Sequence, residues 1–599
     1  MNKHNLFFTA LLITISFFAQ AQYHEYKWTN GNKKAEGVVK EGLEQGEWKF
    51  YSKEGKLEQV VTYKDGEYHG PYKNYYPDGK IAEEGNFYYS MQHGPFKTYY
   101  ESGKIESEGF FKYGYKDSTW VMYFETGKIE FKGNYKRDKK TGTWKWFYPN
   151  GNLRAIFTYD DKGTEYIKEY YDEKGNRMVE NGFGHLIERD EDGNILAEGD
   201  IKDGLRNGHW KTFFKDGKIA SEGFYNHGKQ SKEWKYYYPN GHLKLKGDFK
   251  DGLKSGEWVY YFENDSLYKK ETYQNDTLNG AYEEYFASGI LSTKGQYKNG
   301  KKEGQWMYYF KDGTPDIEAS FKNGLKDGHW KYYFPGNILQ YEGDYVNDKK
   351  NGLWTFYYKN GKKLKEGYYK NGVKNGEWKY WADNGQLVMR GKFENGKEEG
   401  EWKSWYDDGT KKETGNFKYG LMHGKWQGWF PNGNPDYEGE YDMGLKSGVW
   451  QHWYDNGQLE SMETYLVFSE EDKPYYLKDN ENKYAQFTKK GKRISVLDGY
   501  YIQYYKNGNI NKTGNYKLGE KEGKWTFYYE SGVKLADYNF KNGRYEGKQT
   551  EYYETGMPKK IFSYKNFEPH GKWTFYTKKG EIKKIIYFKK GKKVKEVEK

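Results

Sequence analysis

Four tryptophans spaced 24 residues apart carry the clearest potential for chemistry in this 599-residue sequence. Trp381, Trp405, Trp429 and Trp453 each lie three residues after the aromatic residue of a Gly-x-Trp motif. Flat indoles at regular intervals can stack on an extended glycan or peptide, and exposed aromatic surface of this kind marks binding sites. We therefore predict a ligand-binding row. The alternative is that Trp replaces the Tyr of other repeats and packs against its lateral neighbours.

Catalytic and metal-binding motifs are not evident elsewhere in the sequence. No G-x-S-x-G, H-E-x-x-H or P-loop motif occurs, and the absence of Cys excludes disulfides, thiol nucleophiles and Cys-based metal sites. His209 and His329 fill the variable place of Gly-x-Trp motifs, which is typical of surface substitutions. The stretch from Glu188 to Asp200 resembles a calcium loop, but its twelfth position is Gly199 where an EF-hand needs Glu. We predict a non-enzymatic protein with no metal and no cofactor.

Charge is concentrated at the C-terminal end. The chain carries +11, of which +7 lies in residues 578–599, where ten Lys stand against three Glu. The body between the N-terminal leader and this segment is nearly balanced and mixes Lys with Glu. A nucleic-acid-binding face would need a basic stripe, so no nucleic-acid partner is expected. The basic C-terminal tail predicts a weak, salt-sensitive attraction to anionic envelope surfaces, unless it is simply a solvated last repeat.

The first 21 residues have the features of a secretory signal peptide. Lys3 precedes an apolar run from Leu6 to Phe18, and Ala19-Gln20-Ala21 forms an A-x-A cleavage site. The run is shorter than the about 20 residues that span a bilayer, and no second apolar segment follows, so no transmembrane segment is expected. We predict export to the periplasm or the extracellular space, with the mature chain beginning at Gln22 and associated with the envelope.

A repeat of 24 residues positions all of these side chains. Its Gly-x-Trp aromatic, here called position 0, recurs from 48 to 144, from 186 to 450 and from 501 to 573, which with two imperfect copies gives about 22 units. The tryptophans at position 0 are predicted to be structural: Trp48, Trp144, Trp210, Trp234, Trp258, Trp306, Trp330, Trp354, Trp378, Trp402, Trp426, Trp450, Trp525 and Trp573.

Two turns in each unit predict two strands. Asn-Gly or Asp-Gly pairs follow six residues after position 0, and a second set follows eleven residues later, as at Asn360-Gly361 and Asn371-Gly372. Asn-Gly between alternating segments is a strong hairpin signal, because both residues tolerate a positive φ. The sequence therefore predicts an all-β chain, an elongated antiparallel meander of tandem hairpins shaped as a ribbon or half-pipe.

A two-residue first turn would fix the register of each hairpin. Position +4 would then face +9, +2 would face +11, and the Trp would face +13, which is usually Gly, so that the indole of Trp210 would cover Gly223. Positions 0, +2 and +15 would form an aromatic face. Positions +1, +3 and +12 would form a polar face, on which Lys and Glu pair across strands, as in Lys73–Glu84, Lys97–Glu108 and Lys211–Glu222.

The repeat is interrupted twice. We divide the chain into a signal peptide (1–21), regular blocks (22–159, 186–465 and 499–590), a degenerate repeat (160–185), an insertion (466–498) and the basic tail (591–599). Insertions in repeat proteins form loops, often on a binding face. The alternative for this insertion is an extra hairpin without a role.

The repeat resembles the bacterial MORN-repeat variant. The resemblance rests on segments such as GEWKFYSKEGKLEQV at Gly46 and GKWTFYYESGVKLADYNF at Gly523, and it covers nearly all of the chain after the leader. It implies serial β-hairpins in a curved sheet and, for most members, no known activity. The function predicted is an exported binding or scaffolding surface at the envelope, whose partner would be a protein or an envelope polymer. Some bacterial members are antitoxins, so the alternative is an antitoxin or immunity protein that neutralises a cognate toxin.

Overall fold

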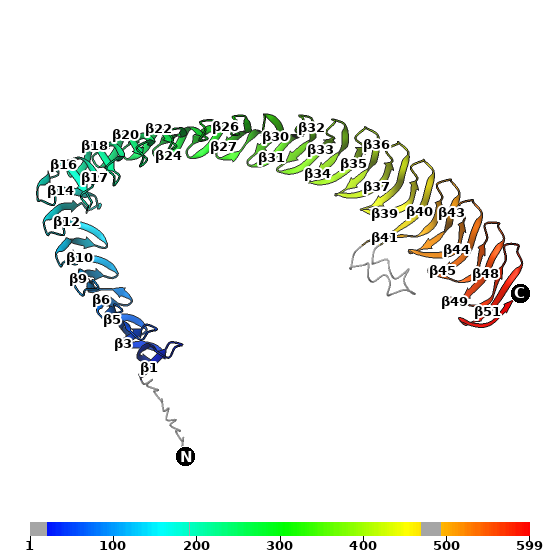
Figure 1. The fold of residues 1–599 in the computed structure, drawn as a ribbon, viewed down its shortest axis with the longest axis horizontal. Helices are drawn as coiled ribbons and strands as arrows, with labels where there is room; N and C mark the ends of the chain where they lie inside the picture. Colours follow the sequence, from blue (N-terminus) through cyan, green and yellow to red (C-terminus); the bar gives the residue numbers. More distant parts are fainter. Residues whose placement is uncertain (1–20, 191, 469–492) are drawn as a thin grey trace, which may run out of the picture. The chain divides into compact units, whose positions relative to one another are not determined.

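The computed structural model describes residues 21–190, 192–468 and 493–599. Residues 1–20 of the predicted signal peptide and most of the predicted insertion lie outside the described residues. Within them the chain forms one open antiparallel sheet of 52 strands (Figure 1), which confirms the predicted all-β meander of tandem hairpins. The chain divides into two compact units, Met1–Asn279 with Ala287–Gly289 and Gly280–Phe286 with Ile290–Lys599, and each is described by itself.

The strands of the first unit pair with their neighbours in chain order. They are β1 (Gln22–Lys27), β2 (Lys33–Lys40), β3 (Leu43–Tyr51), β4 (Leu57–Lys64), β5 (Glu67–Tyr75), β6 (Ile81–Tyr88), β7 (Met91–Gln92), β8 (Gly94–Tyr99), β9 (Ile105–Lys112), β10 (Tyr115–Tyr123), β11 (Ile129–Lys136), β12 (Lys139–Phe147), β13 (Leu153–Tyr159), β14 (Glu165–Tyr171), β15 (Arg177–Glu180), β16 (Phe183–Arg189), β17 (Ile195–Lys202), β18 (Leu205–Phe213), β19 (Ile219–Asn226), β20 (Lys229–Tyr237), β21 (Leu243–Lys250), β22 (Leu253–Tyr261) and β23 (Leu267–Gln274).

The strands from β24 onward follow the same order. They are β24 (Thr277–Tyr285), β25 (Leu291–Lys298), β26 (Lys301–Tyr309), β27 (Pro315–Lys322), β28 (Leu325–Lys326), β29 (Gly328–Phe334), β30 (Ile338–Val346), β31 (Lys349–Tyr357), β32 (Lys363–Lys370), β33 (Val373–Trp381), β34 (Leu387–Glu394), β35 (Lys397–Trp405), β36 (Lys411–Lys418), β37 (Leu421–Trp429), β38 (Pro435–Asp442), β39 (Leu445–Trp453), β40 (Leu459–Phe468), β41 (Ile494–Leu497), β42 (Gly499–Tyr504), β43 (Ile510–Lys517), β44 (Glu520–Tyr528), β45 (Lys534–Lys541), β46 (Arg544–Tyr545), β47 (Gly547–Tyr552), β48 (Pro558–Lys565), β49 (Glu568–Pro569), β50 (Gly571–Tyr576), β51 (Ile582–Lys589) and β52 (Lys592–Glu598).

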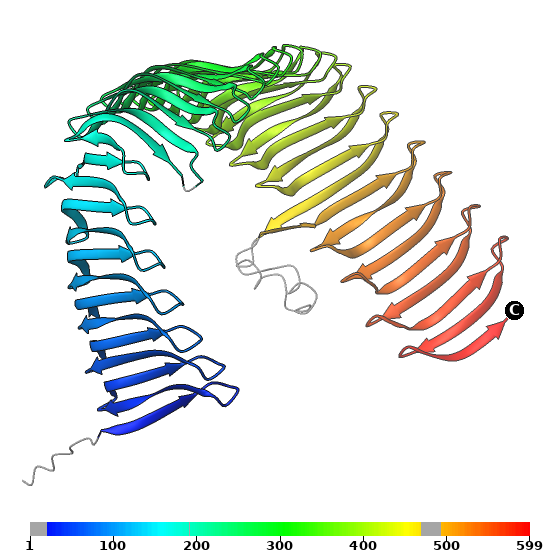
Figure 2. The same cartoon turned by 60° about the vertical axis from the view of Figure 1, so that its left-hand side comes forward.

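The two turns of each repeat lie at opposite ends of the strands (Figure 2) and differ in type. The second turn has two residues with positive φ, such as Asn371 at 51° and Gly372 at 85°, as the Asn-Gly signal predicts. The first turn has three residues. The Tyr358 N–H donates to the carbonyl of Lys362, and within the predicted pair only Gly361, at 81°, has a positive φ. The two-residue first turn predicted from sequence is therefore wrong.

The longer first turn shifts the register at the end of the hairpin. Positions +2 and +11 pair as predicted, but +3 pairs with +9 where +4 was expected, as Trp381 does with Leu387. Asn at +6 has a different role from the one predicted. The Oδ1 of Asn360 accepts the N–H of Lys362 at 3.0 Å, and its Nδ2 donates to the carbonyl of Asp383 in the next repeat at 2.9 Å. The side chain thus closes its own turn and holds the following one.

Each position-0 indole packs between two neighbouring strands. Trp234 pairs with Gly247, as predicted, but its ring covers Gly223 on the preceding strand, where a Cβ would lie 2.2 Å from Cδ2. Its Nε1 donates to the carbonyl of Phe224 at 3.0 Å. Gly223 is therefore covered by Trp234 and not by Trp210, because the indole N–H reaches back to the carbonyl ten residues earlier and draws the ring over that strand.

The polar face largely confirms the predicted ion pairs. Lys73 lies 3.6 Å from Glu84, and Lys97 lies 3.7 Å from Glu108. The third predicted pair is in register, but Glu222 contacts the ring of His209 at 3.6 Å and accepts the Tyr237 hydroxyl at 2.7 Å. Exposed pairs of this kind contribute little to stability.

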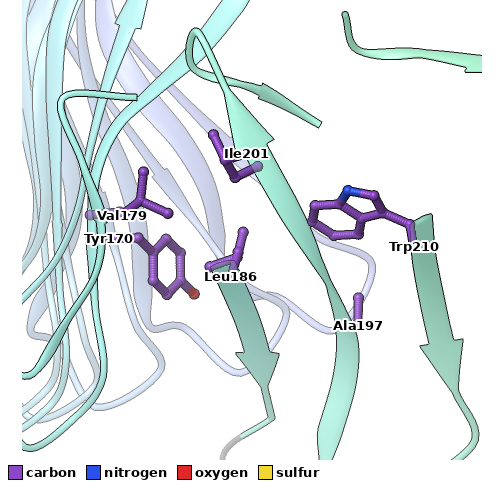
Figure 3. Packing of buried hydrophobic residues seen from close by; sticks show 7 residues of the cluster. Tyr170, Val179, Leu186, Ala197, Ile201 and Trp210 are labelled. Carbon is purple, nitrogen blue, oxygen red and sulfur yellow. The ribbon is translucent and has the colours of Figure 1, made fainter. Parts of the chain in front are cut away.

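Both interruptions preserve the sheet. At the degenerate repeat, β15 has only four residues, and a mixed aliphatic and aromatic cluster forms the core (Figure 3), made up of Ala155, Tyr170, Val179, Leu186, Ala197, Ile201 and Trp210. At the insertion, the end of β40 pairs with β41, and the hydroxyl of Tyr454 still donates to the carbonyl of Tyr504 across the interruption at 2.9 Å.

Candidate functional site

The four predicted ligand-binding tryptophans end four alternate strands of the second unit. Trp381 closes β33, Trp405 closes β35, Trp429 closes β37 and Trp453 closes β39. All four side chains are half-buried, where the prediction had them exposed. One strand lies between each and the next, so a spacing of roughly 10 Å, or two strand spacings, follows from sheet geometry.

Cationic side chains lie over three of these indoles. The Lys363 ammonium lies 5.6 Å from the ring of Trp381, the Arg390 guanidinium 5.9 Å from that of Trp405, and Lys411 5.6 Å from that of Trp429. Lys and Arg over a ring face are attracted by its quadrupole. The row therefore combines flat apolar rings with positive charge.

The repeats that carry Tyr at +3 use it differently. The hydroxyl of Tyr333 donates to Glu318 at 2.8 Å, and that of Tyr357 donates to Glu342 at 2.9 Å. Burial, followed by the hydrogen bond to Glu342, raises the pKa of Tyr357 to about 12. A Trp cannot make this bond, because the indole has no hydroxyl.

The acidic partner is missing before two of the four tryptophans, whereas Glu366 remains before Trp381 and pairs with Lys363 at 2.7 Å. The place of Glu318 and Glu342 is taken by Arg390 before Trp405 and by Thr414 before Trp429. Before Trp453 the Glu remains, but it pairs with Lys425 at 2.6 Å. The four tryptophans therefore do not make the hydrogen bond that Tyr333 and Tyr357 make to Glu.

The structural tryptophans occupy the predicted places. Thirteen of the fourteen are buried, and Trp573 is half-buried and lies beside Phe562 where other repeats have Gly. Trp120 belongs to the same set, with its Nε1 donating to the carbonyl of Phe110 at 3.2 Å.

A row of lysines on the aromatic face was missed from sequence. The Lys four residues before position 0 places its ammonium over the indole, as Lys350 does at 4.1 Å from Trp354 and Lys254 at 4.3 Å from Trp258. Burial lowers the pKa of both ammonium groups. The recurrence of Lys at this place in the repeat was a signal that could have identified the row.

The other candidate residues occupy ordinary structural positions. His329 is exposed and contacts Asp344 at 2.8 Å and Glu342 at 3.3 Å. In the suspected calcium stretch, Asp190 accepts the backbone N–H of Asn194 at 2.8 Å in the turn between β16 and β17. Among the described residues, no group of three or more His, Asp or Glu is arranged to hold a metal ion.

The basic C-terminal segment is part of the sheet. Residues 592–598 form β52, which pairs with β51 and leaves most of its lysines exposed. No helix in the described ranges has the length and apolarity required to cross a bilayer.

The comparison with known families agrees with this geometry. The profile described as MORN repeat variant matches twenty segments, beginning with 44–65 and ending with 569–590. The chain belongs to the MORN repeat variant family. The profile does not match residues 162–205 or 467–496, which contain the degenerate repeat and the insertion of this MORN-variant protein, so the matched repeats are fewer than the about 22 predicted.

More distant comparisons add no functional information about this MORN-variant protein. No curated protein matches it. A crystal structure of TcdB2-TccC3 is 10% identical over 94% of this chain and 31% of its own, with a TM-score of 0.13. A structure of the Photorhabdus luminescens Tc holotoxin pore is 10% identical over 95% and 30%, with a TM-score of 0.11. The chain spans about a third of the length of these proteins, and such TM-scores carry no conclusion about function.

Proposed function

We propose that this MORN-variant protein is an exported, non-enzymatic binding or scaffolding protein of the cell envelope. The observation that carries the proposal is the run of four successive repeats with Trp at +3. These repeats give up the hydrogen bond between Tyr and Glu, and three of them place a cation over the indole. Aromatic surface combined with positive charge suits an extended partner with flat or anionic groups, such as an envelope glycan or peptide.

Export is supported by the leader in residues 1–21. Fusing these residues to a reporter should direct it out of the cytoplasm, and deleting them should retain the protein inside. A protein that is found in the cytoplasm with an intact N-terminus would contradict export. That result would favour the antitoxin alternative implied by the family resemblance.

The Trp row is tested by capture. We expect the chain with Trp381, Trp405, Trp429 and Trp453 replaced by Ala to lose capture of polymer from an envelope extract, while its melting temperature falls by only a few degrees. The rings are half-buried, so part of their contact with the sheet is lost in every case.

The matched control removes four aromatic rings at the same place in other repeats. Tyr309, Tyr333, Tyr357 and Tyr528 replaced by Ala should lower stability, because at least two of them bond to Glu, and should leave capture intact. Capture that survives the Trp variant, or that is lost equally in both variants, would reject the Trp row as the binding site.

A further inference from the structure

On the aromatic face of the second unit, as of the first, a lysine covers most of the position-0 indoles. In six repeats the Lys four residues before position 0 places its ammonium 4.1–4.7 Å from the ring centroid, over Trp306, Trp330, Trp354, Trp378, Trp450 and Trp525. We call this space over the ring the ammonium slot. The attraction between an ammonium and an indole face explains why a buried or half-buried indole keeps a cation there.

Two successive repeats break the rule. The residue four places before Trp402 is Glu398, and the one before Trp426 is Met422. The aromatic residue at +2 is lost in the same two repeats, where Ser404 and Gly428 stand in place of rings such as Tyr380. The missing lysines and the missing rings lie on the same face of neighbouring hairpins.

The result is a cavity of about 410 Å³ on the aromatic face. Its walls include Trp402, Trp426, Tyr380 and Phe417, and the carboxylates of Glu398 and Glu413 line it as well. Trp402 is 7% exposed, whereas Trp378 in the adjoining intact repeat is 0% exposed. The cavity therefore reaches the indoles of Trp402 and Trp426, whose repeats lack the Lys of the ammonium slot.

The hydrogen-bond acceptors of the cavity are Glu398, Glu413 and Ser404, which line it together with three lysines. Ser404 lies directly between Met389 and Glu413 in the sheet register, and its hydroxyl is buried without a hydrogen-bond partner among the described residues. Glu413 accepts the hydroxyl of Tyr437, whose ring lies over Gly428. A buried hydroxyl without a partner is costly unless a ligand or water satisfies it.

The lysines at the margin of the cavity have other partners. Lys374 lies over Trp378 at 4.4 Å and Phe393 at 4.5 Å, within its own repeat's ammonium slot. Lys403 pairs with Glu401 at 2.8 Å, and Lys412 lies over the ring of Tyr406 at 5.5 Å. None of these ammonium groups lies over Trp402 or Trp426.

We propose that this cavity binds an organic ammonium group, which takes the ammonium slot left by Glu398 and Met422. The indole faces attract the cation, and the two carboxylates and the Ser404 hydroxyl accept its N–H groups. The donor of the group is either the side chain of a lysine in a peptide or a free alkylamine. The site lies on the aromatic face and is distinct from the row formed by Trp381, Trp405, Trp429 and Trp453.

The ligand chemistry is tested with matched probes on the full-length protein. We expect n-butylammonium to bind at millimolar concentration in a calorimetric or saturation-transfer titration, and n-butanol to bind at least about tenfold more weakly. A peptide with one lysine that binds more tightly than n-butylammonium identifies the peptide as the source, and the reverse order identifies a free amine. Equal binding of the charged and neutral probes, or no binding up to about 50 mM, would overturn the proposal.

The location of the binding site is tested with variants that restore the usual residues of the repeat. E398K returns the missing ammonium, and S404Y returns the missing ring, so each should weaken n-butylammonium binding at least about tenfold while the melting temperature is maintained. The control is Q230K, which adds a Lys before Trp234, where the +2 ring of Tyr236 is present, and it should leave binding unchanged. Unchanged binding in both E398K and S404Y would place the ligand elsewhere.

Discussion

At the scale of single residues, the array rests on the contact between a Trp and a Gly eleven residues before it. The indole lies flat on the bare backbone of the preceding strand, and its N–H satisfies the carbonyl next to that glycine, as Trp378 does with Gly367 and Tyr368. Burying an indole requires a partner for its N–H, and the arrangement supplies one in every such repeat. A side chain on the glycine would separate the ring from the strand.

We expect Gly367→Ala to destabilise the hairpins around it by about 1–3 kcal/mol, the usual range for overpacking. The added Cβ would lie 2.2 Å from Cδ2 of Trp378, so the ring must move. Hydrogen exchange of β32 and β33 measures the local loss. Ala319→Gly is the control, because Trp330 already accommodates a Cβ there, and it should cost about 0.5–1 kcal/mol. Equal protection in the wild type and Gly367→Ala would contradict the expectation.

At the scale of elements, each hairpin is tied to the next through its turns as well as its strands. Tyr358 donates its hydroxyl to the carbonyl of Trp381 at 2.8 Å, and the same bond recurs from Tyr406 to Trp429. Such bonds cross from one first turn to the following one, and they hold the strand ends at Trp381 and Trp429. The last strand, β52, has no following hairpin among the described residues to pair with, and it carries exposed lysines, which protect sheet edges from further pairing.

The exposed lysines of this edge predict attraction to anionic lipid surfaces. Replacing Lys589, Lys590, Lys592 and Lys595 by Gln should weaken retention on phosphatidylglycerol vesicles at least about tenfold in low salt, because each lysine near such a surface contributes about 1 kcal/mol. Retention of the wild type should fade in high salt through screening. A vesicle sedimentation assay measures both effects.

The control for the edge lysines removes the same charge elsewhere on the sheet. Lys301, Lys349, Lys370 and Lys397 are also exposed, and replacing them by Gln changes the net charge equally. If the two variants lose retention to the same degree, the net charge is responsible and the edge has no special role.

At the scale of the whole molecule, stability accumulates from many similar repeats, each in contact mainly with its neighbours. In such arrays the free energy of unfolding is approximately a sum of repeat and interface contributions. A pKa shift that many repeats share therefore contributes to the stability of the chain once for each repeat. The tyrosines at +3 are such a shared feature, since burial and a hydrogen bond to Glu raise the pKa of Tyr99, Tyr123 and Tyr357 to about 12.

These tyrosines predict a loss of stability in alkali. The folded chain holds their protons up to about pH 12, whereas the unfolded chain releases them near pH 10, so the stabilisation is complete below pH 10 and is lost as the pH rises through 12. Thermal unfolding followed by circular dichroism should show a melting temperature that falls between pH 10 and 12. Replacing several of these tyrosines by Phe should flatten this fall, and a constant melting temperature over the range would contradict the assignment.

The sequence by itself determined the repeat, the number of turns and the two faces. The 24-residue period, the two Gly-containing turns and the alternation of aromatic with charged residues are local properties, and a hairpin is a local structure. For the same reason the pairing of positions 0 with +13 and +2 with +11 was correct, since both partners belong to one hairpin.

The packing of successive hairpins against one another was decided only by the tertiary structure. Whether an indole covers the glycine before it or after it depends on which carbonyl its N–H reaches, and the turn spacing does not specify that choice. The sequence of a single repeat does not predict the cavity beside Trp402. It lies where Ser404 replaces a ring and where Glu398 and Met422 replace the lysines of successive repeats, and only packing in three dimensions brings these positions together.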